Sequence, residues 1–518
     1  MPKYEGISYR MQRLFIIVLS FCVVASAVAA PTTTSTKTNT SPSKQQIARN
    51  IDNLIKKQVG NVNIGIVIKN LDTGKVIYEK NPKRSFVPAS TMKVLTGFSG
   101  LLFLGPNYRY KTTILADNRQ IHHGTLNSDV YIKFSGDPTL KISHLKHMIE
   151  RLKQQGIHAI NGDVYVDDTA FGTNDIGPGW MWDDTRYCFS APTSAAMING
   201  NCIHMQVKPN KSVGKPVQII PIGSAKYVDY RNFTTTKAGK GGFCRLDLHS
   251  NINNIYTLDG CMRAHSEARG LSIAVQNPEI YAEKIIADLL GSAGIRVTGK
   301  VRTGSSRDSL VLLAQHQSKP LKELTKKMLK DSDNLIANSV FKTLGRQYYK
   351  SSGSWKNGAK AMKNIIGKSA KVDLKNSSIV DGAGLSRYDL ITPQQLLDVL
   401  NYAYHDKAIK NDFMNALPTS GIDGTLKNRM GQAITIRKIR AKTGTMSHVT
   451  SLAGYITTKD KQTVGFAIMM NGAAGRLGKY RRLEDQICTY LAQINVKPKA
   501  KPKTVAQTTT QSPTKKAP

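Results

Sequence analysis

The sequence predicts an α/β (α+β) fold, in which an antiparallel sheet flanked by helices is interrupted by a large, mostly β insertion. Three observations predict it. A β-hairpin pattern lies near residue 64, strand-like runs fill residues 435–470, and the middle third carries four clustered cysteines and many turn residues. At 518 residues the chain exceeds what one hydrophobic core usually organises, so we expect two or more domains.

The first 30 residues have the pattern of a secretory signal peptide. Lys3, Arg10 and Arg13 precede an apolar run over residues 14–24, and Ala27-Val28-Ala29 offers a cleavage site. An uncleaved membrane anchor is the alternative, but the apolar run is shorter than the roughly 20 residues that span a bilayer. We therefore predict residues 1–30 as signal peptide and export to the periplasm.

Both ends of the exported chain have linker-like compositions. Residues 31–45 are rich in Thr and Ser, and residues 496–518 mix Lys, Pro, Thr and Gln without apolar periodicity. We predict a linker at 31–45 and a basic disordered tail at 496–518.

The first structured elements follow the linker. Ile47, Ile51, Leu54 and Ile55 recur at the spacing of an amphipathic helix. The runs 64–68 and 75–78, separated by a turn at 72–74, then predict a β-hairpin.

The C-terminal part mirrors this beginning. Strands are predicted at 435–437, 450–456 and 463–470, followed by a helix through 483–491, so both chain ends are expected to share one antiparallel sheet. Helices are also predicted at 321–330 and 335–344. In the middle third, strands at 130–132 and 164–166 suggest an inserted domain.

Five cysteines remain after signal removal, and four of them lie within residues 188–261. Export permits disulfides, so we expect two bridges among Cys188, Cys202, Cys244 and Cys261, although the sequence leaves three pairings open. A zinc site is the alternative, but no Cys-x-x-Cys pair occurs. We expect Cys488 to be buried and unpaired.

The formal net charge is +38, of which +30 falls on residues 31–495. Such charge attracts nucleic acid in many proteins, but export favours anionic envelope polymers or a solvated lysine-rich surface instead. We expect no nucleic-acid partner and no membrane span after signal cleavage. The basic body and tail are compatible with peripheral association with the cell envelope.

A possible nucleophile lies at Ser90-Thr91-Met92-Lys93, where a turn gives way to an apolar helical run. Residues three apart share a helix face, so Lys93 is expected beside the Ser90 hydroxyl, and the helix N-terminus favours a developing anion. A desolvated lysine can take the proton of a serine. A helix-capping serine followed by a surface lysine is the structural alternative.

Two further motifs are individually weak. Ser332-Asp333-Asn334 lies between two predicted helices, where a short loop presents a hydroxyl and an amide; an N-cap is the alternative. Lys442-Thr443-Gly444-Thr445 lies at a predicted strand edge, where glycine permits close backbone approach. The side chains of Lys442 and Thr443 can bind a carboxylate there. A plain strand end is the alternative there.

The order Ser-x-x-Lys, Ser-x-Asn, Lys-Thr-Gly-Thr matches the serine penicillin-recognising enzymes. Across residues 45–495 the chain resembles the low-molecular-mass class C penicillin-binding proteins, of the penicillin-binding protein 4 type. The stretches that carry the resemblance are 134–140, 182–192, 329–337 and 381–387, together with the long separation of Ser90 from Ser332.

This resemblance implies a transpeptidase-like catalytic domain formed by residues 46–110 and 315–495. It also implies an insertion over 111–314 that comprises two subdomains. The activity implied is that of a serine-type D-Ala-D-Ala carboxypeptidase/endopeptidase on peptidoglycan stem peptides and cross-links, inhibited covalently by β-lactams and needing no cofactor or metal.

Residue roles follow from the same resemblance. Ser90 is expected to be acylated, Lys93 to act as its base, and Ser332, Asn334 and Lys442 to relay protons and position substrate. The substrate is expected along Thr443, Gly444 and Thr445, with the backbone amides of Ser90 and Thr445 as the oxyanion hole.

The resemblance also implies recognition of diaminopimelate, whose free end carries an ammonium and a carboxylate, by Asp184, Phe189 and Arg387. A structural salt bridge and a core phenylalanine are the alternative. The chain departs from the family pattern at Ser447, where a relative has glutamine, which leaves fine substrate preference open.

Other functions find less support in the sequence. A β-lactamase shares the three motifs but lacks a large insertion, and a non-catalytic cell-wall scaffold has no need of the nucleophile. The phosphate-loop-like run 294–300 is followed by Val301 instead of Ser or Thr, and His122-His123 has no third ligand at useful spacing.

Overall fold

The computed structural model describes residues 41–117, 121–239 and 241–497. The predicted signal peptide, most of the linker and nearly all of the tail lie outside the described residues. No helix within the described ranges is long and apolar enough to cross a membrane.

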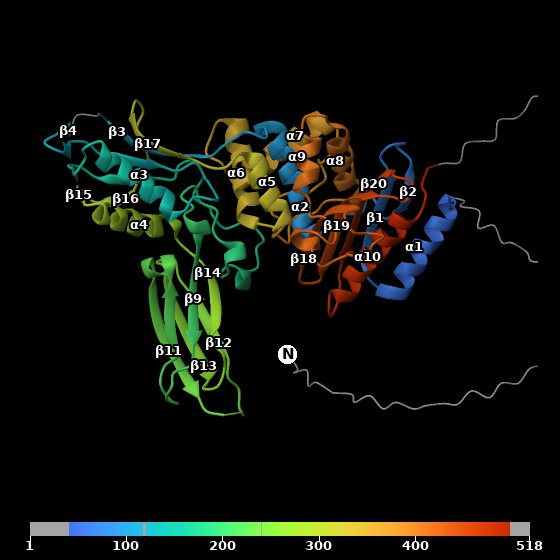
Figure 1. The fold of residues 1–518 in the computed structure, drawn as a ribbon, viewed down its shortest axis with the longest axis horizontal. Coiled ribbons are helices and arrows are strands. Elements are labelled where there is room, and N and C mark those ends of the chain that lie inside the picture. The colour runs from blue at the N-terminus through green and yellow to red at the C-terminus, as the bar shows by residue number, and fades with distance from the viewer. Residues whose placement is uncertain (1–40, 118–120, 240, 498–518) are drawn as a thin grey trace, which may run out of the picture. The chain divides into compact units, whose positions relative to one another are not determined.

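One five-stranded antiparallel sheet joins the two ends of the described chain (Figure 1). Its order is β18 (Ile439–Met446), β19 (Val449–Thr457), β20 (Thr463–Asn471), β1 (Asn63–Asn70) and β2 (Val76–Lys80). β1 pairs with β20 from Asn63 opposite Asn471 to Asn70 opposite Val464. The predicted hairpin and the predicted sharing of one sheet are confirmed.

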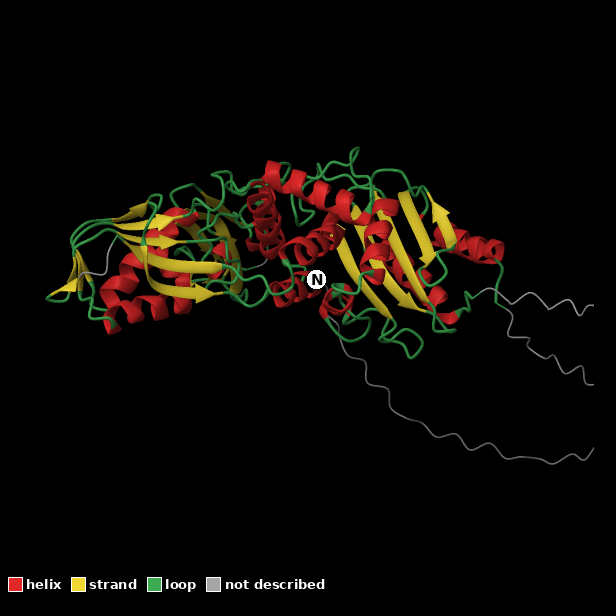
Figure 2. Ribbon diagram, turned by 90° about the horizontal axis from the view of Figure 1, so that it is seen from above, coloured by secondary structure: helices red, strands yellow, loops and turns green. Residues whose placement is uncertain are grey.

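Helices cover both faces of this sheet, as Figure 2 shows. On one face pack α1 (Lys44–Val59) and α10 (Gly478–Gln493). On the other pack α2 (Met92–Ser99), α5 (Leu321–Lys330), α6 (Asn334–Tyr349), α7 (Trp355–Ala370) and α8 (Pro393–His405), with the short α9 (Lys410–Ala416). Apolar side chains alternate along the strands toward the two helical layers, so the sheet is buried on both faces.

The insertion has a hydrophobic core of its own. The chain enters it at β3 (Lys111–Ala116) and leaves at β17 (Val311–Gln317), and these two strands pair with Lys111 opposite Gln317. They belong to a sheet in the order β16 (Val301–Thr303), β8 (Val164–Asp167), β6 (Val130–Lys133), β3, β17. The helices α3 (Ile142–Gln154) and α4 (Pro278–Ser292) contribute to this core. A second sheet contains β15 (Arg296–Val297), β7 (Ala159–Ile160), β5 (Thr125–Leu126) and β4 (Ile121–His122).

Two three-stranded sheets complete the insertion. One has the order β10 (Gln218–Ile222), β9 (Cys202–Lys208), β14 (Arg269–Ala274), and the other β11 (Asp229–Lys237), β13 (Ile255–Arg263), β12 (Leu246–Ser250). Disulfides join Cys188 to Cys202 and Cys244 to Cys261, so the expectation of two bridges is confirmed and the pairing is fixed. Cys488 is free and buried, as predicted.

Two element predictions need correction. Residues 435–437 form a turn before β18 instead of a strand, because the Thr435 hydroxyl donates to the carbonyl of Met430 and Arg437 has a left-handed φ of 63°. The first helix begins at Lys44, inside the predicted linker, because Ser43 caps it by accepting from the Gln46 amide.

Candidate active site

Ser90 lies in a 3₁₀ turn, Ala89–Thr91, immediately before α2. Ala89 is fully buried and has a φ of 48°, a backbone conformation that residues other than glycine rarely adopt. The Thr91 and Ser451 hydroxyls both donate to the carbonyl of Pro88, at 2.7 and 2.6 Å. The turn is thus held by one hydrogen bond from its own residue Thr91 and by another from Ser451 of β19.

Two glycines let the neighbouring backbone approach this turn. A Cβ atom at Gly384 would overlap the carbonyl of Ala89, and one at Gly444 would overlap the Ser451 hydroxyl. Gly384 also has a φ of +73°. Any side chain at these positions would displace the segment that carries Ser90.

Lys93 is fully buried in α2 and is the hub of the cluster. Its Nζ donates to Ser90 Oγ at 2.9 Å, to Asn334 Oδ1 at 2.6 Å and to the carbonyl of Ala383 at 2.8 Å. Burial lowers the pKa of Lys93 from 10.5 to about 7, against the opposing pull of carboxylates led by Asp381. A large share of Lys93 is therefore neutral at physiological pH.

The second predicted motif lies directly across from Lys93. Ser332 has a left-handed φ of 61°, and Asp333 caps α6 by accepting from the Ile336 amide. Asn334 is the first residue of that helix, and its Nδ2 donates to the Phe189 carbonyl at 2.6 Å. The N-cap alternative thus applies to Asp333, not to Ser332 or Asn334.

The third motif lies on β18, the edge strand of the sheet. The buried Lys442 donates from Nζ to Ser332 Oγ at 3.0 Å, and Thr443 Oγ1 donates to Thr425 Oγ1 at 2.8 Å. Burial, reinforced by repulsion from Lys93, holds the pKa of Lys442 well below its usual range. Ser90, Lys93 and Asn334 form one hydrogen-bonded group, and Ser332 and Lys442 form a second. The two groups lie close enough for Lys93 to lower the pKa of Lys442, and together we call them the catalytic cluster.

Asp184, Phe189 and Arg387 border the cluster from two parts of the chain. Phe189 is 48% exposed and stacks on Tyr187 with ring centroids 5.8 Å apart, so the core-phenylalanine alternative is wrong. Burial and Asp183 raise the pKa of Asp184, while Arg387 lowers it. Arg387 donates to the Ser447 carbonyl at 2.9 Å. No Asp184–Arg387 ion pair occurs among the described residues.

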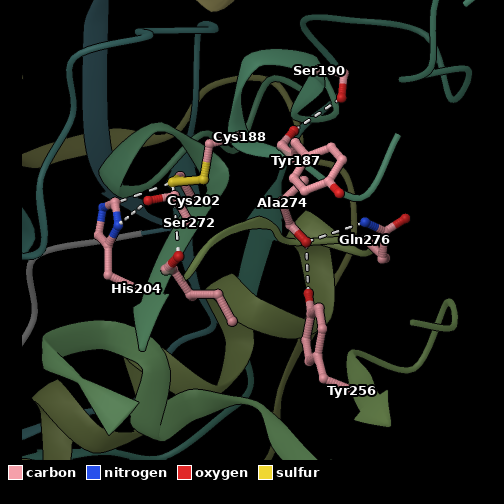
Figure 3. The surroundings of a disulfide bond; sticks show 10 residues. Tyr187, Cys188, Ser190, Cys202, His204, Tyr256, Ser272, Ala274 and Gln276 are labelled. Carbon is pink, nitrogen blue, oxygen red and sulfur yellow. Dashed lines mark hydrogen bonds between the residues drawn. A yellow bond between two sulfur atoms is a disulfide. The ribbon is translucent and has the colours of Figure 1, made fainter. Parts of the chain in front are cut away.

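The segment that bears Phe189 is anchored within the insertion (Figure 3). Cys188 is bonded to Cys202 at the start of β9, and the Ser190 hydroxyl donates to the Tyr187 carbonyl at 2.9 Å. Tyr187 also pairs with Ile273 of β14. The insertion therefore presents a fixed carbonyl to Asn334 of the catalytic cluster.

Sequence reasoning assigned no role to Asp381, which organises the loop beside Lys93. This buried carboxylate accepts from the backbone amides of Ala383, Gly384, Leu385 and Ser386, and from the Trp180 indole at 2.9 Å. The Asp-Gly-Ala-Gly sequence was a signal for such a turn, because Asp side chains bond amides two and three residues on.

Comparisons with known proteins identify the family of this chain. A model of the D-Ala-D-Ala carboxypeptidase 3 (S13) family matches residues 47–494. The chain is 35% identical over 425 residues to D-alanyl-D-alanine carboxypeptidase DacB of Haemophilus influenzae, covering 82% of this chain and 88% of the relative. It is 28% identical over 427 residues to a D-alanyl-D-alanine carboxypeptidase of Actinomadura sp., covering 79% of this chain and 78% of the relative.

A solved structure gives the same result. The crystal structure of penicillin binding protein 4 (dacB) from Haemophilus influenzae superposes with a TM-score of 0.81 at 33% identity, covering 86% of this chain and 99% of the other. A second structure of that protein, complexed with a β-lactam, gives a TM-score of 0.75 at 32% identity, with coverages of 86% and 99%. The chain belongs to the D-Ala-D-Ala carboxypeptidase 3 (S13) family.

Proposed function

We propose that this chain is a serine-type D-Ala-D-Ala carboxypeptidase and endopeptidase. Its substrates are peptidoglycan stem peptides and cross-links, cleaved through an acyl-enzyme on Ser90, and β-lactams acylate the same hydroxyl. The observation that carries the proposal is the 2.9 Å contact between Ser90 Oγ and the Nζ of Lys93, whose pKa burial lowers to about 7.

Acylation begins when neutral Lys93 takes the Ser90 proton and Oγ attacks the carbonyl of the penultimate D-alanine. The backbone amides of Ser90 and Thr445 stabilise the negative charge that develops on the carbonyl oxygen. Collapse breaks the peptide bond, and the proton that Lys93 took from Ser90 passes through the Ser332 hydroxyl, held by Lys442 at 3.0 Å, to the leaving amine, which leaves Lys93 neutral again. The products are an ester on Ser90 and a free amine.

Deacylation reverses the roles of these groups. Lys93 accepts a proton from water as the water attacks the ester, and Ser90 recovers its proton when the trimmed stem leaves. Asn334 holds Lys93 through Oδ1, and it is itself fixed by the Phe189 carbonyl. Thr443, Gly444 and Thr445 line up the substrate backbone along the edge of β18.

Asp184 and Arg387 are proposed to recognise the two charges at the free end of diaminopimelate, with Phe189 against its methylene chain. The side-chain exposure of Phe189 and the opposite charges of the other two residues support this assignment. Because Ser447 is too short to replace a glutamine, Arg387 is expected to carry most of the carboxylate recognition.

The proposed cellular setting is the periplasm, reached after cleavage of a signal peptide at residues 1–30. The two disulfides of the insertion support an oxidising compartment. We assign catalysis to residues 46–110 and 315–495 and treat 111–314 as the insertion. The pairing of β3 with β17 supports the entry at residue 111, whereas β17 continues past the proposed exit to Gln317.

The proposal is tested by incubating the exported protein with purified disaccharide pentapeptide and with a cross-linked dimer, and following products by chromatography and mass spectrometry. Loss of one D-alanine, or cleavage of the dimer, is expected for the wild type and for Ser212→Ala, an exposed control. Ser90→Ala is expected to give neither. Product formation by Ser90→Ala at the wild-type rate would refute the mechanism.

A further inference from the structure

The two three-stranded sheets of the insertion end in a cluster of loops remote from α4. At the near end, Lys226 and Tyr227 contact Asp288 of α4, at 3.0 and 2.6 Å. At the far end lie residues 208–217, 237–239, 241–247 and 261–269, which we call the distal loops (Figure 1). Neither the catalytic cluster nor its bordering residues include any of them.

The distal loops are tied together despite their exposure. The Gly214 amide donates to the Thr236 carbonyl at 2.8 Å, and the Thr236 amide donates to the Lys215 carbonyl at 2.8 Å. The Arg263 guanidinium donates to the carbonyls of Gly239, Gly241 and Gly242, at 2.7, 3.0 and 2.8 Å. Cys244 is bonded to Cys261. The side chains on these loops are therefore presented by a connected scaffold.

The distal loops carry an excess of positive charge. They contain seven basic residues against two acidic ones, a net charge of +5. Arg245 pairs with Asp247 at 2.8 Å, and Arg263 is engaged with carbonyls. The other five are exposed and form no ion pair with any described residue: Lys208, Lys211, Lys215, Lys237 and Arg269.

The distal loops also carry exposed apolar side chains. Phe243 is 82% exposed and Val213 is 56% exposed. A solvated cationic surface does not require exposed apolar side chains, and neither does a surface that binds a polysaccharide through charge alone. Cations around an exposed aromatic ring are typical of protein surfaces that adsorb to anionic bilayers, where the ring enters the headgroup region and the cations face lipid phosphates.

We propose that the distal loops dock onto an anionic lipid surface. Lys211, Lys215 and Lys237 supply the electrostatic attraction, and Phe243 inserts at the boundary between headgroups and acyl chains. The exported enzyme is thereby held at a membrane face through its insertion, at a site separate from the Ser90 cluster.

The test is co-sedimentation of the exported protein with phosphatidylcholine vesicles containing about one third phosphatidylglycerol. Binding is expected at about 0.05 M salt, to weaken at about 0.5 M, and to be lost on pure phosphatidylcholine. The variant Lys211→Glu/Lys215→Glu/Lys237→Glu should bind at least about a hundredfold more weakly, because loss of each lysine weakens adsorption about fivefold and each added glutamate is repelled by the anionic surface.

Matched controls separate docking from general charge. Lys326→Glu/Lys356→Glu/Lys360→Glu changes the net charge equally at exposed positions of α5 and α7, and it should retain most binding. Phe243→Ser should weaken adsorption without altering its salt dependence. Hydrolysis of soluble muropeptides should be unchanged in every variant, which distinguishes failure of docking from failure of the proposed activity.

Three outcomes would overturn the proposal. One is equal vesicle binding by the two triple variants, and another is vesicle binding that does not change in Phe243→Ser. The third is loss of binding to isolated peptidoglycan sacculi, but not to vesicles, in the distal-loop variant, which would assign the surface to a wall polymer.

Discussion

Lys93 and Lys442 are two buried lysines in one cluster, and each hydrogen-bonds a different serine. Lys93 Nζ lies 2.9 Å from Ser90 Oγ, and Lys442 Nζ lies 3.0 Å from Ser332 Oγ. Burial lowers the pKa of Lys93 to about 7, and repulsion from Lys93 reinforces the effect of burial on Lys442. Burial therefore accounts for a lysine that serves as a base near neutral pH.

The rate of acylation by a fluorescent penicillin should depend on the neutral form of Lys93. Since burial lowers its pKa to about 7, the rate should fall below pH 7 as Lys93 gains a proton and level off above it. In Lys442→Met the midpoint of the residual rate should stay near pH 7, because burial is what lowers the pKa of Lys93. A rate that is flat from about pH 5.5 to 8.5 would exclude Lys93 as the base.

Gly384→Ala should impair acylation by displacing the turn that carries Ser90. The added Cβ overlaps the Ala89 carbonyl, and misplacing a nucleophile by about 1 Å costs on the order of a hundredfold in rate. Gly105→Ala is the matched control, because Gly105 also has a positive φ, +86°, but faces open space. Equal acylation rates in the two variants would show that close packing at Gly384 is not required.

Arg387→Met should reduce discrimination between stem peptides. Diaminopimelate carries a carboxylate that lysine lacks, so this variant should lose about tenfold to a hundredfold in kcat/KM on diaminopimelate peptides and little on lysine peptides. Asp184→Asn removes the partner of the ammonium, which both peptides carry, and should affect both. Penicillin acylation should change in neither. The assignment fails if Arg387→Met affects both peptides equally.

The two disulfides should differ in their effect on catalysis. Both close loops of similar length, with sequence separations of 14 and 17, so replacing either pair by serine should lower the free energy of unfolding by about 3 kcal/mol. Only Cys188→Ser/Cys202→Ser should raise KM for muropeptides, because Cys188 anchors the segment whose Phe189 carbonyl holds Asn334. Similar KM values in both double variants would contradict this role of the insertion.

Much of the fold was predictable because its signals are local. The hairpin of β1 and β2, the amphipathic α1 and the apolar runs of β19 and β20 each follow from hydrophobic periodicity. The run 435–437 has three residues, which is too short to show a hydrophobic periodicity. Thr435 bonds locally to the Met430 carbonyl instead, and this side-chain hydrogen bond competes with strand formation.

The side-chain motifs of the site were predictable, but its main-chain partners were not. Ser90, Lys93, Ser332, Asn334 and Lys442 are recognisable from residue type, order and resemblance. The carbonyls of Ala383 and Phe189, which accept hydrogen bonds from Lys93 and Asn334, carry no signature because every residue has such a group. Sequence alone does not reveal which backbone the fold brings to a side chain.

The most direct test of the account is intact-mass spectrometry of the exported protein after exposure to a penicillin, comparing wild type with Ser90→Ala. We predict a mass increase of one penicillin on the wild type, mapping to the peptide that contains Ser90, and none on the variant. A folded wild type that gains no mass and leaves the drug intact would contradict the account, as would equal labelling of Ser90→Ala.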